Sequence, residues 1–227
     1  IDEHVVEAIQ VHERATPRES ALGRVRGLAE RLSIQRRRLT DYPHQLSGGM
    51  RQRVMIALGL VLNASLIIAD EATTSLDVIV EAKLLDQLRE IRDDYGVTIL
   101  MITHNIALVA EVADRVAVMY AGQMVEIGSV VDVFDNPLHP YTQGLLRSVP
   151  NISLDEDAPL YKMAGEPPNL TRPPTGCRFH PRCPQASAAC KASEPTLIDA
   201  GRGHLVHCLN CTNERQTARA ATGEVAS

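Results

Sequence analysis

Two short apolar runs, separated by one amphipathic helix, constrain the fold of this chain most strongly. The first run, residues 66–69, ends in the acidic pair Asp70-Glu71, and the second, residues 97–102, ends in Thr103-His104. Between them leucines recur at helical spacing until Gly96. This order of strand, helix and strand predicts buried parallel strands in an α/β layer fold, with polar chemistry at their carboxyl ends.

The flanking segments also show regular patterns. Residues 1–33 predict two amphipathic helices around a break at Thr16-Pro17, and helix-forming residues run from Ser47 to about residue 63. Residues 116–120 and 123–127 predict a hairpin around Ala121-Gly122, followed by a helix over residues 130–134. Beyond residue 150, frequent Pro, Gly and Cys predict a loop-rich appendage.

Charge and hydropathy exclude two classes of protein. The net charge of −5 argues against a nucleic-acid partner, and we interpret the basic triplet at residues 36–38 as a solvated loop. No apolar run reaches the roughly 18 to 20 residues of a spanning helix, and no signal peptide opens the sequence. Any membrane association is therefore expected to be peripheral.

The segment LSGGMRQR, residues 46–53, has the pattern of an anion-binding helix start. Ser47 is a capping residue, and Gly48 and Gly49 leave the first backbone N–H groups unobstructed. Ser-Gly-Gly alone is more often an ordinary capped helix, and the longer segment shifts the interpretation towards phosphate binding.

The acidic pair fits phosphoryl transfer to water. One carboxylate can hold magnesium while its neighbour polarises a water molecule. An isolated acidic pair is more often a helix-terminal charge pair, but here Ser75-Leu76-Asp77 follows it and His104 closes the next run.

In these four motifs the sequence closely resembles the ABC ATPase family. LSGGMRQR resembles the family signature, LIIADE the Walker B strand, SLD the D-loop, and His104 the switch histidine. The resemblance implies ATP and Mg²⁺ as cofactors. It implies that Asp70 serves the magnesium through water, that Glu71 is the general base, and that His104 contacts the γ-phosphate. By the same resemblance, Ser47, Gly48 and Gly49 reach the γ-phosphate of ATP held by a second ATPase subunit, and Gln52 and Asp77 are further nucleotide-binding residues.

Two departures from the family pattern bear on activity. Ala72 stands where the family usually has Pro, and the sequence contains neither G-x-x-x-x-G-K-[ST] nor the Q-loop glutamine. We expect truncation rather than decay, because Glu71 and His104 are retained, and we expect the fragment alone to be inactive. A non-catalytic half that only donates its signature in trans is the alternative, and a repair- or translation-type ABC ATPase is a second rival.

Residues 136–146, NPLHPYTQGLL, resemble the C-terminal extension of ATPase subunits of oligopeptide and dipeptide importers. The resemblance implies an ATP-hydrolysing subunit that powers peptide import, although nickel and some glycoside systems share the extension. It implies transmembrane permease subunits as partners, a peptide-binding protein as an indirect one, and a peripheral location at the cytoplasmic face of the plasma (inner) membrane.

Five cysteines lie in the C-terminal third of the sequence. Reducing compartments disfavour disulfides, and only Cys208 and Cys211 form the close pair usual for zinc. The spacing of Cys177, Cys183, Cys190 and Cys208 suits a [4Fe-4S] cluster, and residues 176–184 resemble the iron-sulfur segment of some peptide importers. Zinc and unligated thiols remain the alternatives, and Cys211 is interpreted as spare unless it replaces Cys208.

These observations predict an α/β fold, a partial P-loop NTPase domain of the ABC ATPase type. We expect a helical signature subdomain over residues 1–64 and the remainder of the ATPase core over 65–135. A cysteine-containing extension is expected over 136–211, and a disordered tail over 212–227.

Overall fold

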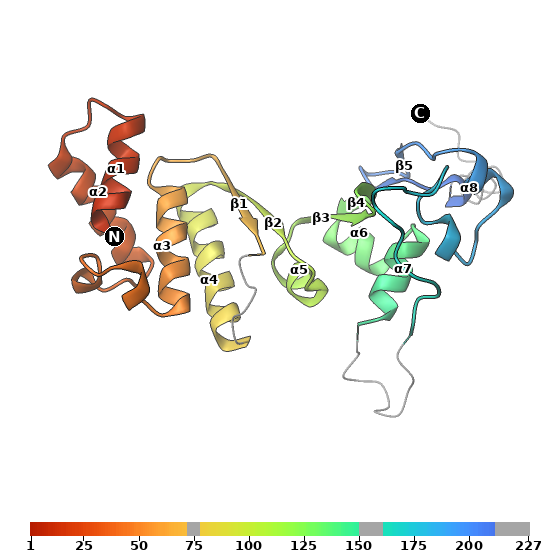
Figure 1. Cartoon of the computed structure of the whole chain (residues 1–227), viewed down its shortest axis with the longest axis horizontal. Helices are drawn as coiled ribbons and strands as arrows, with labels where there is room; N and C mark the ends of the chain where they lie inside the picture. Colours follow the sequence, from red (N-terminus) through yellow and green to blue (C-terminus); the bar gives the residue numbers. More distant parts are fainter. Residues whose placement is uncertain (72–77, 150–160, 212–227) are drawn as a thin grey trace. The chain divides into compact units, whose positions relative to one another are not determined.

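The structure, a computed structural model, describes residues 1–71, 78–149 and 161–211 (Figure 1). The chain divides into two compact units, residues 1–104 and 105–227. The predicted tail and the SLD motif with Asp77 lie outside the described residues. The division into four parts therefore stays a prediction.

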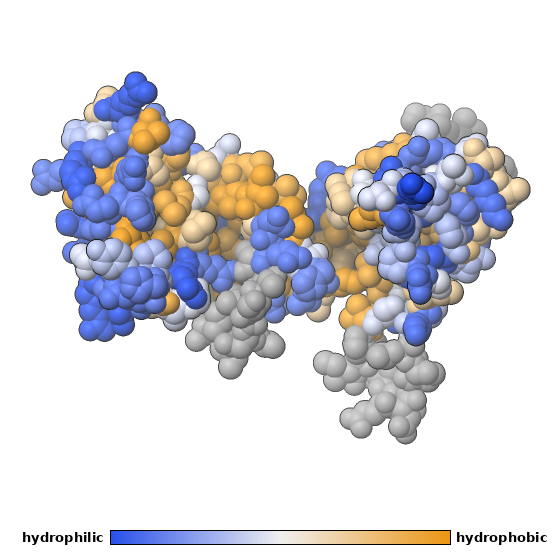
Figure 2. Space-filling view, viewed as in Figure 1, coloured by the Kyte–Doolittle hydropathy of each residue, from blue (hydrophilic) through white to orange (hydrophobic). Residues whose placement is uncertain are grey.

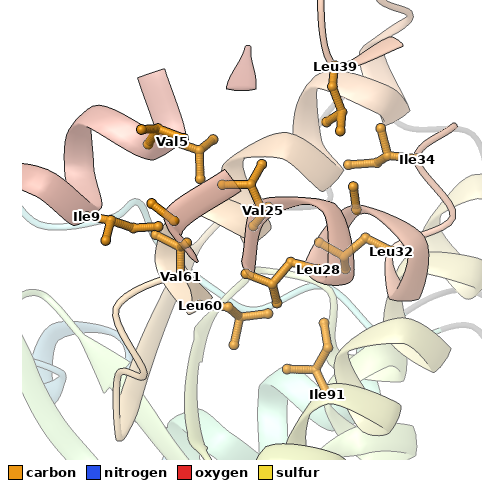
Figure 3. Close-up of a cluster of buried hydrophobic side chains, with 14 of the residues drawn as sticks. Val5, Ile9, Val25, Leu28, Leu32, Ile34, Leu39, Leu60, Val61 and Ile91 are labelled. Carbon is orange, nitrogen blue, oxygen red and sulfur yellow. The ribbon is translucent and has the colours of Figure 1, made fainter. Parts of the chain in front are cut away.

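Unit 1 begins with a helical region. Its elements are α1 (Asp2–His12), α2 (Arg18–Arg31), two 3₁₀ turns (Arg36–Arg38 and Pro43–Gln45) and α3 (Gly48–Leu60). The two predicted N-terminal helices are confirmed, and their apolar faces meet α3 in one buried cluster. Val5, Ile9, Val25 and Leu28 of α1 and α2 point towards Leu60 at the end of α3 (Figure 3). This packing holds the last turn of α3 in the core through Ala57 and Leu60.

The α/β part of unit 1 has the predicted order of elements. Strand β1 (Leu66–Asp70), helix α4 (Val78–Tyr95) and strand β2 (Thr98–Ile102) follow one another, and the two strands pair in parallel. Asp70 lies opposite Ile102 in this pairing. The parallel register brings the carboxyl ends of the two strands to the same edge, as the sequence predicts.

The prediction that both strands are buried was wrong. Ile67 and Ile99 pack against the core of unit 1, but the opposite face is open, with Ile68 61% and Leu100 49% exposed. Apolar residues gather over β1 and β2 on the surface (Figure 2). The sequence misleads because a run of apolar residues at every position predicts two covered faces, whereas within unit 1 only one is covered.

Unit 2 is built on a hairpin. Its elements are α5 (Ile106–Val112), β3 (Arg115–Tyr120), β4 (Gln123–Ser129), α6 (Val130–Asp135), α7 (Pro140–Arg147), a 3₁₀ turn (His180–Arg182), α8 (Ala188–Ala192), β5 (Ile198–Asp199) and β6 (Leu205–Val206). The predicted hairpin is confirmed, and Ala121 and Gly122 at its turn both have positive φ. The sheet order is β3-β4-β6-β5, so the cysteine-containing segment adds two short strands to the hairpin.

Among the described residues, none of the helices combines the length and apolar character needed to cross a membrane.

Candidate functional site

The start of α3 is an accessible helix N-terminus. The Oγ of Ser47 accepts a hydrogen bond from the backbone N–H of Met50 at 3.3 Å, and Leu46 before it is buried. Ser47 and Gly48 are exposed, and a Cβ added to Gly48 would meet no atom within 4 Å. Buried Leu46 thus anchors the turn, and Gly48 leaves open space at the first turn of α3, as an anion-binding helix start requires.

Gly49 and Gln52 lie further along the same helix. Both are half-buried, and with Leu84 and Gln87 of α4 they line a small hollow between α3 and α4. Gln52 is therefore less accessible than Ser47 and Gly48.

The acidic pair lies at the carboxyl end of β1, and both of its members are exposed. The backbone N–H of Glu71 donates to the carbonyl of Ile102 at 2.9 Å, so the end of β1 is tied to the end of β2. Glu71 has φ 46°, a left-handed backbone conformation that is uncommon for a residue with a Cβ. Such local strain clusters at functional sites.

His104 lies beside Glu71. Its Nδ1 is 3.5 Å from Oε1 of Glu71, and the two side chains are 79% and 55% exposed. At that exposure the ion pair adds little to stability. The pair instead places a carboxylate and an imidazole at one accessible edge, where they can meet a ligand from solvent.

The second candidate site is the cysteine segment of unit 2. The backbone N–H of Cys177 donates to the carbonyl of Cys190 at 2.8 Å, which joins two of the cysteine positions directly. Burial raises the pKa of Cys183 to about 11 and also raises the pKa of Cys177. The charges of Cys190 and Cys208 also act on both thiols, more weakly than burial. Cys177 and Cys183 pack against the same buried cluster, and the backbone bond joins Cys177 to Cys190.

Backbone groups also act on these thiols. Burial is the larger cause at both, and against it the backbone of Phe179 and His180 acts to lower the pKa of Cys177, and that of Gln185 the pKa of Cys183. The N–H of Cys211 lies 3.4 Å from Sγ of Cys208, its acceptor. Hydrogen bonds of this kind stabilise a thiolate ligand and tune a bound metal centre.

Cys211 itself is held elsewhere. Its Sγ donates to the carbonyl of Leu138 at 3.0 Å, in the turn before α7. Among the residues that the structure describes, no three His, Cys, Asp or Glu side chains lie close enough to share one metal ion.

Aromatic packing attaches the cysteine segment to the hairpin and to α7. Phe179 is 2% exposed, and its ring lies 5.1 Å from that of Tyr120 and 5.5 Å from that of Tyr141. Arg178 donates to the carbonyl of Ala121 at 2.6 Å. The residues between Cys177 and Cys183 thus anchor the loop that carries both cysteines.

Sequence reasoning missed a buried polar cluster in unit 2. It consists of Glu126 on β4, His139 before α7, and His204 before β6, all at most 4% exposed. Glu126 follows buried Val125, so the strand lacks the alternation that would have marked an inward position. A buried carboxylate in a strand is itself unusual, but its partner lies 78 residues away in the sequence.

Burial also affects His139. Desolvation, with a contribution from the nearby His207, lowers the pKa of His139 to about 3. Its Nδ1 accepts the backbone N–H of Tyr141 at 3.0 Å and caps α7. The imidazole is therefore neutral in the folded protein at any pH near neutrality.

His139 should make the stability of unit 2 depend on pH. Below about pH 6.5 the imidazole of residue 139 is protonated in the unfolded chain, whereas in the folded chain it stays neutral down to about pH 3. The free energy of unfolding therefore decreases as the pH falls from about 6.5 to about 3. Between pH 7 and pH 5 we expect this residue to account for a loss of about 2 kcal/mol. His139→Asn keeps an acceptor for the Tyr141 N–H but does not titrate. Urea unfolding at the two pH values should show a smaller loss in the variant, and equal losses would contradict the prediction.

Two family models match separate parts of the sequence. Residues 2–74 match the model described as ABC transporter, and residues 125–190 match the oligopeptide/dipeptide transporter C-terminal region. The chain carries an ABC transporter segment followed by an oligopeptide/dipeptide transporter C-terminal region. Both resemblances stated from the motifs are thereby confirmed.

Curated relatives of this ABC transporter chain carry matching names. The dipeptide transport ATP-binding protein DppD of Bacillus subtilis is 48% identical over 171 residues, which cover 75% of this chain and 51% of the relative. The oligopeptide transport ATP-binding protein OppD of Salmonella typhimurium is 44% identical, with 94% of this chain and 64% of the relative covered. OppD of Escherichia coli is 42% identical, with coverages of 94% and 63%. The chain spans less than two thirds of the length of each.

Solved structures of ABC cassettes share the fold. The dimeric ABC transporter cassette MJ0796 superposes with a TM-score of 0.50 at 28% identity, covering 57% of this chain and 56% of the cassette. CbiO1 of Clostridium perfringens gives a TM-score of 0.51 at 30% identity, with coverages of 58% and 53%. The predicted fold class, a partial α/β ABC ATPase domain, is confirmed.

Proposed function

We propose that the chain is part of an ATP-binding and ATP-hydrolysing subunit that powers peptide import through an ABC transporter. The observation that carries the proposal is the open, glycine-fronted start of α3 in a sequence matched to ABC transporters. The peptide substrate rests on the second match and on the names of the relatives. A nickel or other small-substrate importer is the alternative for the cargo.

Each site residue has a proposed role. Asp70 holds Mg²⁺ through water, Glu71 accepts a proton from the attacking water, and His104 contacts the γ-phosphate. Bound Mg²⁺ supplies charge neutralisation at the phosphate oxygens. The exposed positions of the three side chains at one strand edge support these roles.

The start of α3 is proposed to act on nucleotide held by a second ATPase subunit, through Ser47, Gly48 and Gly49. Gln52 and Asp77 are proposed as further nucleotide-binding residues. Hydrolysis would drive separate permease subunits at the cytoplasmic face of the membrane, with a peptide-binding protein as an indirect partner. The chain on its own, without G-x-x-x-x-G-K-[ST], would complete a neighbour's site and not its own. The non-catalytic half that only donates its signature remains the second candidate.

The cysteine segment is proposed to hold a [4Fe-4S] cluster through Cys177, Cys183, Cys190 and Cys208. The backbone bond between Cys177 and Cys190, the shared packing of Cys177 and Cys183, and the N–H of Cys211 directed at Sγ of Cys208 support this ligand set. Cys211 is not included in the ligand set because its thiol donates a hydrogen bond to the carbonyl oxygen of Leu138. Iron and acid-labile sulfide analysis of protein purified without oxygen tests the assignment.

A substitution at Gly48 tests the role of α3. In the assembled transporter, Gly48→Asp should lower ATP turnover by more than about tenfold, because it places a carboxylate against a phosphate. The position has open space around it, so the fold should be unchanged.

Gly59, near the end of the same helix, also has no atom within 4 Å of an added Cβ, so Gly59→Asp is the matched control. It should leave turnover unchanged. Equal turnover in the two variants, at equal melting temperatures, would rule out phosphate binding at the start of α3.

A further inference from the structure

The strand that leads to Cys208 is held to the hairpin by a very short pairing. In the register of β6 against β4, Val206 lies opposite Glu126 and Leu205 opposite Ile127. The backbone of His207 adds one hydrogen bond, to the carbonyl of Val125 at 2.9 Å. Because side chains alternate with a period of two, a slip of one residue would reverse every side chain of β6. Two paired residues alone specify a register weakly.

A buried carboxylate lies at this junction. Glu126 is fully buried, and its Oε1 accepts hydrogen bonds from Nε2 of His204 and from the backbone N–H of Leu138, each at 2.7 Å. Its Oε2 accepts from the backbone N–H of His139 at 3.0 Å. One side chain of β4 therefore holds both the turn before α7 and the residue that precedes β6.

The site is shaped for the imidazole. A Cβ added to Gly128 would lie 3.1 Å from Cδ2 of His204 and 3.0 Å from a methyl of Val133. Gly128 thus leaves the space that His204 fills, two residues along the strand from Glu126. His204 is 4% exposed, and a slipped β6 would remove its hydrogen bond to Glu126 and leave the carboxylate only the N–H groups of Leu138 and His139.

We propose that the Glu126–His204 pair is a register lock that positions Cys208, one of the four proposed cluster ligands. The lock acts because only one register of β6 brings His204 to the buried carboxylate, and a slip of one residue would displace Cys208 by about 3.3 Å. Its link to metal binding rests on the proposed cluster. Glu126 and His204 are positioning residues, since neither is a ligand in the proposed set.

The test compares two replacements of His204 in the full chain. His204→Gln keeps an N–H donor near the place of Nε2, and His204→Leu removes it at similar volume. We expect His204→Leu to speed amide hydrogen exchange at residues 205–208 by more than about tenfold. Iron per chain should fall in the same variant. His204→Gln should stay within about twofold of the parent in both measurements.

A surface contact provides the control. Gln123 of β4 donates to Glu194, an exposed carboxylate that also bridges the hairpin to the cysteine segment. Glu194→Gln should leave exchange and iron content unchanged.

The outcomes separate the lock from the cluster. Unchanged exchange in His204→Leu, or equal damage by His204→Gln, would overturn the lock. A parent protein without iron would refute the cluster, and the exchange measurements would still decide the lock. If His204→Leu does not fold, Gly128→Ala is the deciding variant, because its methyl group crowds the imidazole of His204 and removes no polar group. Faster amide exchange confined to residues 204–208 would support the lock, and unchanged exchange would refute it.

Discussion

Replacing Glu71 with Gln is expected to slow ATP turnover of the assembled transporter by roughly a hundredfold to ten-thousandfold. Gln cannot accept the proton of the attacking water, although it has nearly the same shape as Glu. The fold should not change, because the backbone N–H bond from Glu71 to Ile102 remains and the side chain is 55% exposed. Nucleotide binding should persist, while the production of phosphate slows. Equilibrium nucleotide-binding measurements and time-course phosphate assays would test the two expectations.

Glu90 provides the matched control for this substitution. It is an exposed glutamate on α4, and Glu90→Gln makes the same change of charge away from the strand ends. Turnover should match that of the parent. A Glu71→Gln transporter that hydrolyses ATP at the parent rate would remove Glu71 from the role of general base.

Gly176→Ala should destabilise unit 2 by about 3 kcal/mol or more, the range of severe single-residue effects. Gly176 has φ +69°, and a Cβ at this position would lie 2.4 Å from the carbonyl oxygen of Cys190 and 2.8 Å from that of Lys191. Backbone atoms cannot move aside as a flexible side chain can, so the Cys177 N–H bond to Cys190 should break. The free energy of unfolding, measured with urea, and the iron content per chain should both fall, because the proposed ligands Cys177 and Cys190 would move apart.

Gly203→Ala is the control that separates the steric clash expected in Gly176→Ala from the cost of the left-handed backbone conformation. Gly203 has nearly the same φ, +72°, but no atom lies within 4 Å of an added Cβ. Only the left-handed cost of about 1 to 2 kcal/mol should appear there. Equal destabilisation by the two substitutions would show that the contact with Cys190 does not matter.

The sequence predicted the elements of this protein better than their surroundings. Local signals sufficed for the hairpin, because Ala121-Gly122 adopts the positive φ values that a tight turn requires. Local signals did not predict the open face of β1, because the number of buried faces of a strand depends on which elements pack against it and not on the sequence of the strand itself.

The candidate sites divide in the same way. The residues at the start of α3 and at the strand ends were found from motifs, since each motif is contiguous in the sequence. The Glu126–His204 pair was missed, because a contact between residues 78 apart leaves no periodic pattern. The grouping of Cys177 with Cys190 was expected from their spacing and from a family resemblance, but the backbone bond that joins them could not be derived from either.

The open apolar face of β1 and β2 affects how unit 1 interacts with other molecules in solution. With Leu66, Ile68, Leu100 and Ile102 each between 47% and 61% exposed, unit 1 offers an adhesive surface to dyes, detergents and other chains. Fluorescent hydrophobic probes would bind there and be displaced by whatever covers the strands. This surface therefore offers a direct optical readout of assembly.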